Sequence, residues 1–144
     1  MIVQQILTSK SNQTVVTVRP DTPVSEVTQV LTENRIGGVI VSASGDTADG
    51  ILSERDIVRA LSKRGPSCLS DTADQMMTKN PVCCARGDTA DQVLQGMTDG
   101  RFRHMPVVED GKLVGIVTIG DVVKARLSQL SMERDALEGM VAGH

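Results

Sequence analysis

The order of apolar and polar positions in the first part of the chain predicts a strand followed by an amphipathic helix. The β-branched run at residues 15–18 ends at Arg19-Pro20-Asp21, which is typical of a short strand closed by a turn. Thr22 then precedes Pro23, and a hydroxyl residue before a proline at the first helical position is typical of a helix start. The predicted helix carries one apolar stripe, formed by Val24, Val27, Val30 and Leu31. We expect this stripe to pack on a sheet.

A hairpin and a second helix are predicted next. The apolar runs at residues 39–41 and 50–52 flank residues 42–46, which are rich in turn formers. Two short strands joined by a turn fit this pattern. A helix then follows from about Glu54 to Lys63.

The second part of the chain copies this plan. Strands are predicted at residues 82–84, 105–108 and 113–117, with a turn at residues 109–112. A helix is predicted at residues 90–99, where Thr89 and Gln92 are spaced as a capping box. The last helix begins near Gly120 and continues through Leu127, Leu130 and Leu137 toward Met140.

Residue-by-residue matches confirm that the sequence contains an internal repeat. Gly50, Ser53 and Asp56 have counterparts 65 positions later in Gly115, Thr118 and Asp121. Further matches join Arg35-Ile36 to Arg101-Phe102 and residues 5–8 to residues 75–78, with short gaps where loops are expected.

Each repeat contains three predicted strands and two helices, too few to bury both faces of its own sheet. We therefore predict one α/β (α+β) body of two pseudo-symmetric halves packed against each other. The predicted divisions are a first repeat with an N-terminal linker helix at residues 1–64, a second repeat at 65–129, and a C-terminal helix and tail at 130–144.

Composition and charge exclude several classes of function. The net charge of −3 and a single aromatic residue, Phe102, argue against a nucleic-acid partner. The chain has no apolar run near the ~18 residues of a membrane span and no signal peptide, so no membrane partner and a cytoplasmic location are expected. Three cysteines, two of them the adjacent Cys83 and Cys84, suggest neither a disulfide framework nor a metal site. No catalytic motif is present, and we expect no enzymatic activity and no required cofactor.

The strongest candidate chemistry is a hydroxyl and a carboxylate three residues apart, placed twice where a strand meets a helix. These pairs are Ser53 with Asp56 and Thr118 with Asp121. The simpler interpretation is a capping box that satisfies free amides of the first helical turn. The functional interpretation is a phosphate at the hydroxyl and amides, with the carboxylate accepting hydrogen bonds from ribose.

These tandem segments, with the run from Arg103 to Val108 and the lead-in from Met76 to Val82, resemble a pair of cystathionine β-synthase (CBS) domains over residues 3–128. The resemblance implies two βαββα repeats packed sheet to sheet. It also implies a non-catalytic regulatory module that senses AMP, ADP, ATP or NAD(H), with S-adenosylmethionine less favoured, in clefts between the repeats. Such pairs commonly form homodimers that report to a target protein, which the sequence does not name.

By this resemblance, Ser53 and Asp56 serve one cleft and Thr118 and Asp121 the other. The adenine pockets are expected at Thr17, Val18, Gly38 and Val39, and at Cys83, Cys84, Met105 and Pro106. Cys83 replaces the usual threonine, and residues 37–40 lack the His and Pro of the second repeat, so we expect unequal clefts.

The chain supplies cations for a ligand phosphate as well, namely Arg55, Arg101, Arg103 and His104. Solvated surface is the alternative for each of them, and small buried hydrophobic residues are the alternative for Cys83 and Cys84. Two other functions stay open. One is a purely structural dimerisation module with empty clefts. The other is a small enzyme related to inosine monophosphate dehydrogenase, although the chain has no room for a catalytic barrel of ~250 residues.

Overall fold

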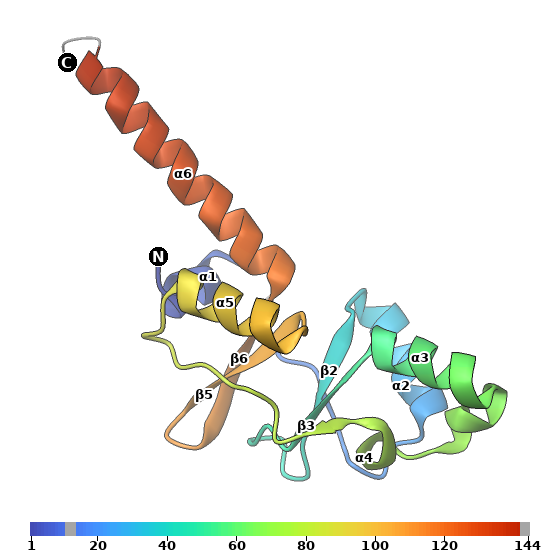
Figure 1. Cartoon of the computed structure of the whole chain (residues 1–144). Coiled ribbons are helices and arrows are strands. Elements are labelled where there is room, and N and C mark those ends of the chain that lie inside the picture. The colour runs from blue at the N-terminus through green and yellow to red at the C-terminus, as the bar shows by residue number, and fades with distance from the viewer. Residues whose placement is uncertain (11–13, 142–144) are drawn as a thin grey trace.

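The computed structural model describes residues 1–10 and 14–141, which form two α/β lobes and a projecting C-terminal helix (Figure 1). The first lobe contains β1 (Thr17–Val18), α2 (Val24–Asn34), β2 (Gly38–Val41), β3 (Gly50–Ser53) and α3 (Glu54–Arg64). A 3-10 turn, η1 (Pro66–Ser70), α4 (Ala73–Met76) and β4 (Thr78–Lys79) follow. The second lobe contains α5 (Ala90–Gly100), β5 (His104–Glu109), β6 (Lys112–Thr118) and the base of α6 (Ile119–Val141), together with α1 (Val3–Ser9).

The helices begin and end close to the predicted positions. α3 starts at a capping box in which the Ser53 hydroxyl accepts from the Asp56 amide, and α5 starts at the predicted Thr89–Gln92 box. Arg35 ends α2 and Arg101 ends α5, both with left-handed backbone at φ 53° and 57°. Corresponding residues therefore adopt the same conformation in both repeats.

The first sheet has four strands in the order β1-β2-β3-β4, where only three were predicted. β1 runs parallel to β2, and the other neighbours are antiparallel. β4 comes from the lead-in of the second repeat and pairs Thr78 with Ile51. This lead-in therefore completes the sheet of the first repeat.

The second sheet differs from the prediction in the opposite direction. It has two named strands, β5 and β6, because the predicted strand at residues 82–84 is reduced to a single parallel bridge between Cys84 and Val107. Two backbone bonds hold this bridge, from the Cys84 amide to Pro106 and from the Val108 amide to Cys84. Pro81 has no amide to extend the pairing, and the Ala85 amide donates to the Asp88 side chain instead.

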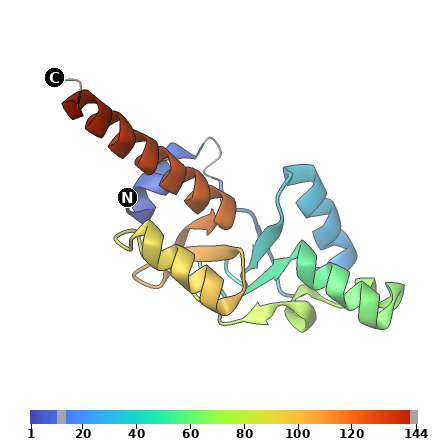
Figure 2. The same ribbon diagram turned by 45° about the horizontal axis from the view of Figure 1, so that its top comes forward.

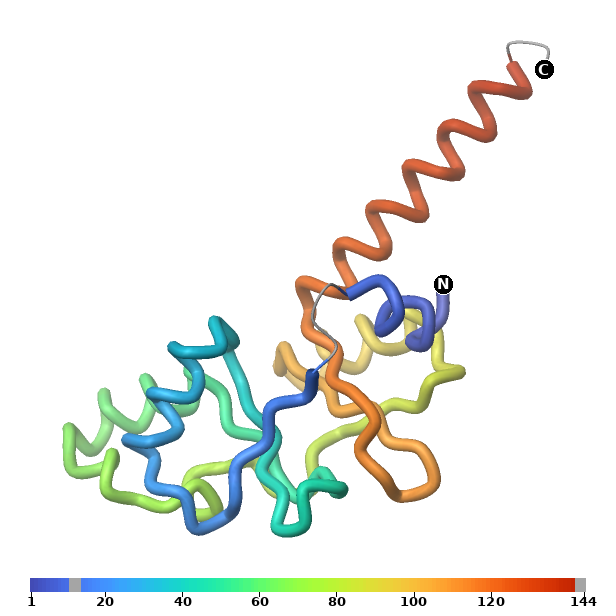
Figure 3. The backbone as a smooth tube through the Cα atoms, turned by 180° about the vertical axis from the view of Figure 1, so that it is seen from behind, coloured from blue at the N-terminus to red at the C-terminus, as the bar shows by residue number. Residues whose placement is uncertain are grey.

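The two lead-in segments are exchanged between the lobes. Val3 and Ile6 of α1 are 0% and 1% exposed in the core of the second repeat, where they pack with Val93, Met97 and Val107. Conversely, Ala73 of α4 is buried in the core of the first repeat. Figure 3 shows α1 beside the base of α6, although α1 directly precedes the first repeat in the sequence. Each core is thus completed by a segment that precedes the other repeat.

α6 leaves the second lobe after its first turns, as the view in Figure 2 also shows. Val122 and Ala125 are buried against this lobe. No helix in residues 1–10 and 14–141 is both long and apolar enough to cross a membrane.

Candidate functional site

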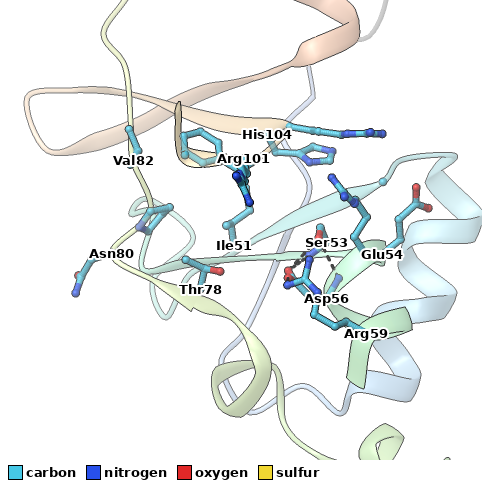
Figure 4. Close-up of a pocket in the computed structure, with 16 residues that line it drawn as sticks. Ile51, Ser53, Glu54, Asp56, Arg59, Thr78, Asn80, Val82, Arg101 and His104 are labelled. Atoms are coloured by element: carbon cyan, nitrogen blue, oxygen red, sulfur yellow. Dashed lines mark hydrogen bonds and ion pairs between the residues drawn. The ribbon is translucent and has the colours of Figure 1, made fainter. Parts of the chain in front are cut away.

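A cleft of about 320 Å³ lies between the two lobes. One wall is formed by the end of β3 and the start of α3, and the other by the end of α5 and the start of β5. The chain after β4 closes a third side. Figure 4 shows Arg101 and His104 on the wall opposite Ser53, Asp56 and Arg59. The cleft therefore brings together residues from both repeats.

Ser53 and Asp56 form a capping box at the wall of this cleft. The backbone amide and the hydroxyl of Ser53 both donate to Asp56 Oδ2 at 2.9 Å. The second carboxylate oxygen, Oδ1, lies 3.8 Å from Arg59 Nη1, which is longer than a hydrogen bond. Capping thus uses one oxygen of Asp56 and leaves the other able to accept from a ligand. The two interpretations of this motif are compatible in a single geometry.

The cleft is rich in guanidinium groups. Arg55 and Arg59 come from α3, and Arg101 and Arg103 come from the end of α5 and the loop after it. Among residues 1–10 and 14–141, only two carboxylates, Glu54 and Asp56, line the same cleft. The local charge is therefore positive although the chain as a whole carries −3. Guanidinium groups bind phosphate oxygens in a bidentate manner, so this cleft suits a phosphorylated ligand.

His104 of the second repeat lies against Gly37 and Gly38 of the first repeat. A Cβ atom added to Gly38 would meet the imidazole at 3.2 Å, and one added to Gly37 would meet it at 3.5 Å. Gly37 and Gly38 occupy the first-repeat positions that correspond to Arg103 and His104, so the missing side chains make room for the ring. The first repeat has glycine where the second has His104, and this missing side chain makes room for the imidazole between the repeats.

Burial lowers the pKa of His104 below its ordinary value, which favours the neutral imidazole. The carboxylates of Glu54, Asp121 and Asp56 oppose this shift, and the ammonium of Lys10 adds to it. These groups come from α3, from α6 and from the end of α1. Charged residues of both predicted sites therefore influence the pKa of His104.

The second predicted site has a different arrangement. The Thr118 amide donates to Asp121 Oδ2 at 2.9 Å, as in the first site, but the same oxygen also lies 2.9 Å from Lys10 Nζ. Lys10 donates in addition to the carbonyl of Ile116 at 3.0 Å. Burial raises the pKa of Asp121, but the bonds from Lys10 and Thr118 outweigh it and the pKa lies below its ordinary value. Here the carboxylate has an ammonium partner that Asp56 does not have.

Six of the predicted site residues line the described cleft, namely Ser53, Arg55, Asp56, Arg101, Arg103 and His104. Val18, Gly38, Val39, Cys84, Met105 and Pro106 are buried in the sheets. Thr17 is half-buried in β1, and Cys83 is exposed with its thiol donating to the Pro81 carbonyl at 3.2 Å. Thr118 is the last residue of β6 and Asp121 lies in the first turn of α6, and both are outside this cleft.

Sequence reasoning missed a large part of the lining. The missed residues are Gly37, Ile51, Glu54, Arg59, Thr78, Asn80, Pro81, Val82, Gly100 and Phe102. The lead-in from Met76 to Val82 was recognised as a feature of the chain, yet nothing in its residue types placed it at this cleft. Arg59 carried a detectable signal, since it lies one helical turn after Asp56 on the same face of α3.

The neighbouring residues Cys83 and Cys84 differ in burial and therefore in the pKa of their thiols. Cys84 is buried and its pKa is raised to about 12, mainly by loss of solvation, whereas Cys83 is exposed and its pKa is raised less strongly. Cys68, Cys83 and Cys84 are all free thiols. Within residues 1–10 and 14–141, no group of three or more His, Cys, Asp or Glu side chains is placed to hold a metal ion.

The fold and the cleft define a tandem-repeat α/β module with a cationic site between its repeats. The family model described as CBS domain matches residues 3–63 and 73–128, and the chain belongs to the CBS domain family.

Solved structures and a curated relative agree with this assignment. A CBS-domain containing protein of Agrobacterium tumefaciens is 43% identical with a TM-score of 0.82, covering 87% of this chain and 92% of that one. CBSX2, solved in complex with AMP, is 29% identical with a TM-score of 0.70, covering 88% and 96%. CBSX3, a mitochondrial CBS domain-containing protein of Arabidopsis thaliana, is 32% identical over 85% of this chain. The match spans 62% of that relative's length.

Proposed function

We propose that this protein is a non-catalytic regulatory module that binds a phosphorylated adenosine ligand, AMP, ADP, ATP or NAD(H), in the cleft between its repeats. The cationic cleft that carries Ser53 and Asp56 on one wall and four arginines around it is the observation on which this proposal rests. Asp56 Oδ1 accepts from the ribose hydroxyls, and Arg55, Arg59, Arg101 and Arg103 bind phosphate. The AMP bound by the related CBSX2 supports this ligand class.

The charge of the cleft favours phosphorylated ligands over S-adenosylmethionine. The sulfonium group of that ligand is a cation and would meet four guanidinium groups at the site. The phosphate of a nucleotide is stabilised by the same groups. Within the nucleotide class, more phosphate charge favours tighter binding.

We also propose that the module works in the cytoplasm as a homodimer and changes a target protein through a change of shape. Free thiols are typical of a reducing compartment. Val58 on α3 and Val123 on α6 occupy corresponding positions, and they are 64% and 43% exposed. Exposed apolar residues at matched positions of both repeats favour a surface that a second copy covers.

The ligand class is tested by thermal unfolding with a panel of AMP, ADP, ATP, NAD(H) and S-adenosylmethionine. A phosphorylated ligand at about a hundredfold excess over its Kd stabilises the fold by ~2.7 kcal/mol, which raises the Tm by roughly 5–10 °C. S-adenosylmethionine is expected to give a smaller shift. Equal unfolding curves with every ligand at millimolar concentration would favour a purely structural module.

Nucleotide affinity is expected to depend on the protonation of His104. Burial lowers the pKa of His104 and favours the neutral imidazole in the free protein, whereas a bound phosphate favours the imidazolium. Proton uptake on binding then makes the affinity rise as the pH falls from 8 to 6, by at most about tenfold per pH unit.

Calorimetric titration of wild type and His104→Gln across this pH range measures the effect. The variant is the matched control, because it retains the titration of the ligand phosphate, whose second pKa is about 6. We expect a steeper pH dependence in the wild type. Superimposable profiles would show that His104 does not couple to the ligand.

A further inference from the structure

The distal part of α6 carries an apolar seam, which we define as Val123, Leu127, Leu130, Leu137 and Val141. These side chains are 43%, 63%, 45%, 62% and 89% exposed. Figure 1 shows the helix leaving the lobe that holds its base. From Leu127 to Val141 every residue is exposed except the half-buried Gln129 and Gly139. A helix of this length with so little burial in its own chain is not stabilised by packing.

The spacing of the seam is that of a coiled coil. Its positions alternate by four and three residues along the helix. The one position of this pattern that is not apolar, between Leu130 and Leu137, is Arg134. An average repeat of about 3.5 residues keeps these side chains on one line along two supercoiled helices. The seam spans about 27 Å of helix at ~1.5 Å per residue. In a helix exposed to solvent on all sides, no packing contact requires this spacing of apolar residues.

Charge is divided along the same helix. Lys124 and Arg126 lie near its base, and Glu133, Asp135 and Glu138 lie in its distal half. A parallel pairing of two copies would place Glu133 against Glu138 of the second copy and bring the two Arg134 side chains together. An antiparallel pairing would place Lys124 against Glu138 of the second copy in two symmetric pairs and pack Arg134 beside Leu130, at the cost of one contact between the two Glu133 side chains near the crossing. The charges therefore favour the antiparallel arrangement.

The apolar positions fit the same arrangement. When two antiparallel copies cross near residue 132, Leu127 faces Leu137 of the second copy and Val123 faces Val141 of the second copy. Every apolar seam residue except Leu130 then meets another apolar residue, and Leu130 meets the aliphatic part of Arg134. Arg134 also lies 4.0 Å from Glu138 Oε1 of its own chain. A charged residue at one seam position is a known device for selecting register and orientation.

We propose that α6 pairs with α6 of a second copy of this chain as an antiparallel two-helix coiled coil through this seam. The inference places the contact of the proposed homodimer on α6 rather than on a surface that includes Val58, and it does not depend on ligand binding. It assigns the helix extension a role in assembly, separate from the cleft between the repeats.

Sedimentation velocity of the full chain over a series of micromolar concentrations tests the seam with two matched variants. Leu130→Glu introduces a charge into the seam, whereas Met132→Glu introduces the same charge on the opposite face, where Met132 is 67% exposed. We expect Leu130→Glu to raise the dimer Kd at least about a hundredfold and Met132→Glu to leave it within about threefold. AMP titration of both variants should match the wild type, because neither residue lines the cleft.

The proposed pairing would be contradicted if the wild-type protein were monomeric at every concentration. It would also be contradicted if both variants weakened the dimer equally or if neither weakened it. Nucleotide binding measured on the same samples reports separately on the proposed ligand. Dimerisation without nucleotide binding would contradict the proposed ligand. Nucleotide binding without dimerisation would contradict the proposed pairing of α6.

A charge exchange tests the orientation. Lys124→Glu and Glu138→Lys should each weaken the dimer severalfold, and the double variant should restore it, because Lys124 and Glu138 of the second copy face each other only in the antiparallel pair. Failure of the double variant to recover affinity would contradict the antiparallel orientation.

Discussion

Replacement of Asp56 with alanine is expected to weaken the binding of a phosphorylated adenosine ligand by at least about tenfold. Asp56 Oδ2 accepts from the Ser53 amide and hydroxyl, whereas Oδ1 carries no capping bond and is the proposed acceptor for the ligand. A hydrogen bond to a charged group contributes ~1.5–3 kcal/mol, and a tenfold change in Kd corresponds to ~1.4 kcal/mol. Calorimetric titration with the best ligand of the panel measures the loss.

Asp121→Ala is the matched control for this experiment. Asp121 caps α6 through the Thr118 amide as Asp56 caps α3 through the Ser53 amide, so each variant loses a cap at a cost of ~0.5–2 kcal/mol, and Asp121→Ala loses in addition the ion pair with Lys10. Asp121 lies outside the described cleft, so its replacement should weaken binding in that cleft much less than replacement of Asp56 does. If Asp56→Ala lowered stability but left the affinity unchanged, its role would be capping alone.

A second large effect is expected from Ile6→Ala, although this residue precedes the first repeat. Ile6 is 1% exposed and packs in the core of the second repeat through α1. Truncation of a buried isoleucine costs ~2–5 kcal/mol because a cavity is left in the core. For a chain of this length the Tm should fall by roughly 6–20 °C in thermal unfolding followed by circular dichroism.

Ile2→Ala controls for the change in composition at the same end of the chain. Ile2 is 37% exposed, and its backbone bond to Gln5 does not need the side chain. We expect a cost within about 1 kcal/mol for this variant. Equal and small effects of the two substitutions would contradict the exchange of α1 into the second repeat.

The repeat architecture could be predicted because it depends on local signals. The Thr89–Gln92 capping box, the stripe from Val24 to Leu31 and the shared spacing of Gly50 and Gly115 each act within one element or one repeat. The helices accordingly begin and end within a few residues of the expected positions.

The exchange of lead-in segments could not be predicted from such signals. Val3 and Ala73 are small apolar residues whose types do not specify which repeat they enter. β4 contains only two residues, and its pairing with β3 is decided by tertiary contact rather than by propensity. The chain at residues 82–84 has β-forming residues, yet Pro81 and the bond from Ala85 to Asp88 limit its pairing to Cys84.

Prediction of the candidate site was limited in a similar way. Ser53 and Asp56 were identifiable because hydroxyl and carboxylate are close in sequence, and Arg103 and His104 because they form a distinctive run. Arg59 and Thr78 reach the same cleft from a helix face and from the exchanged lead-in. The cleft is cationic because the fold brings four arginines together, and the net charge of −3 gives no indication of this.

The most direct test of the regulatory, ligand-binding role is a calorimetric titration of the full chain with AMP, ADP and ATP at pH 7. We predict saturable binding, with ATP or ADP at least as tight as AMP because four arginines surround the cleft. Uncharged adenosine should bind more weakly than all three. Absence of saturable heat with every nucleotide, at protein and ligand concentrations that detect a Kd of about 1 mM, would contradict the account.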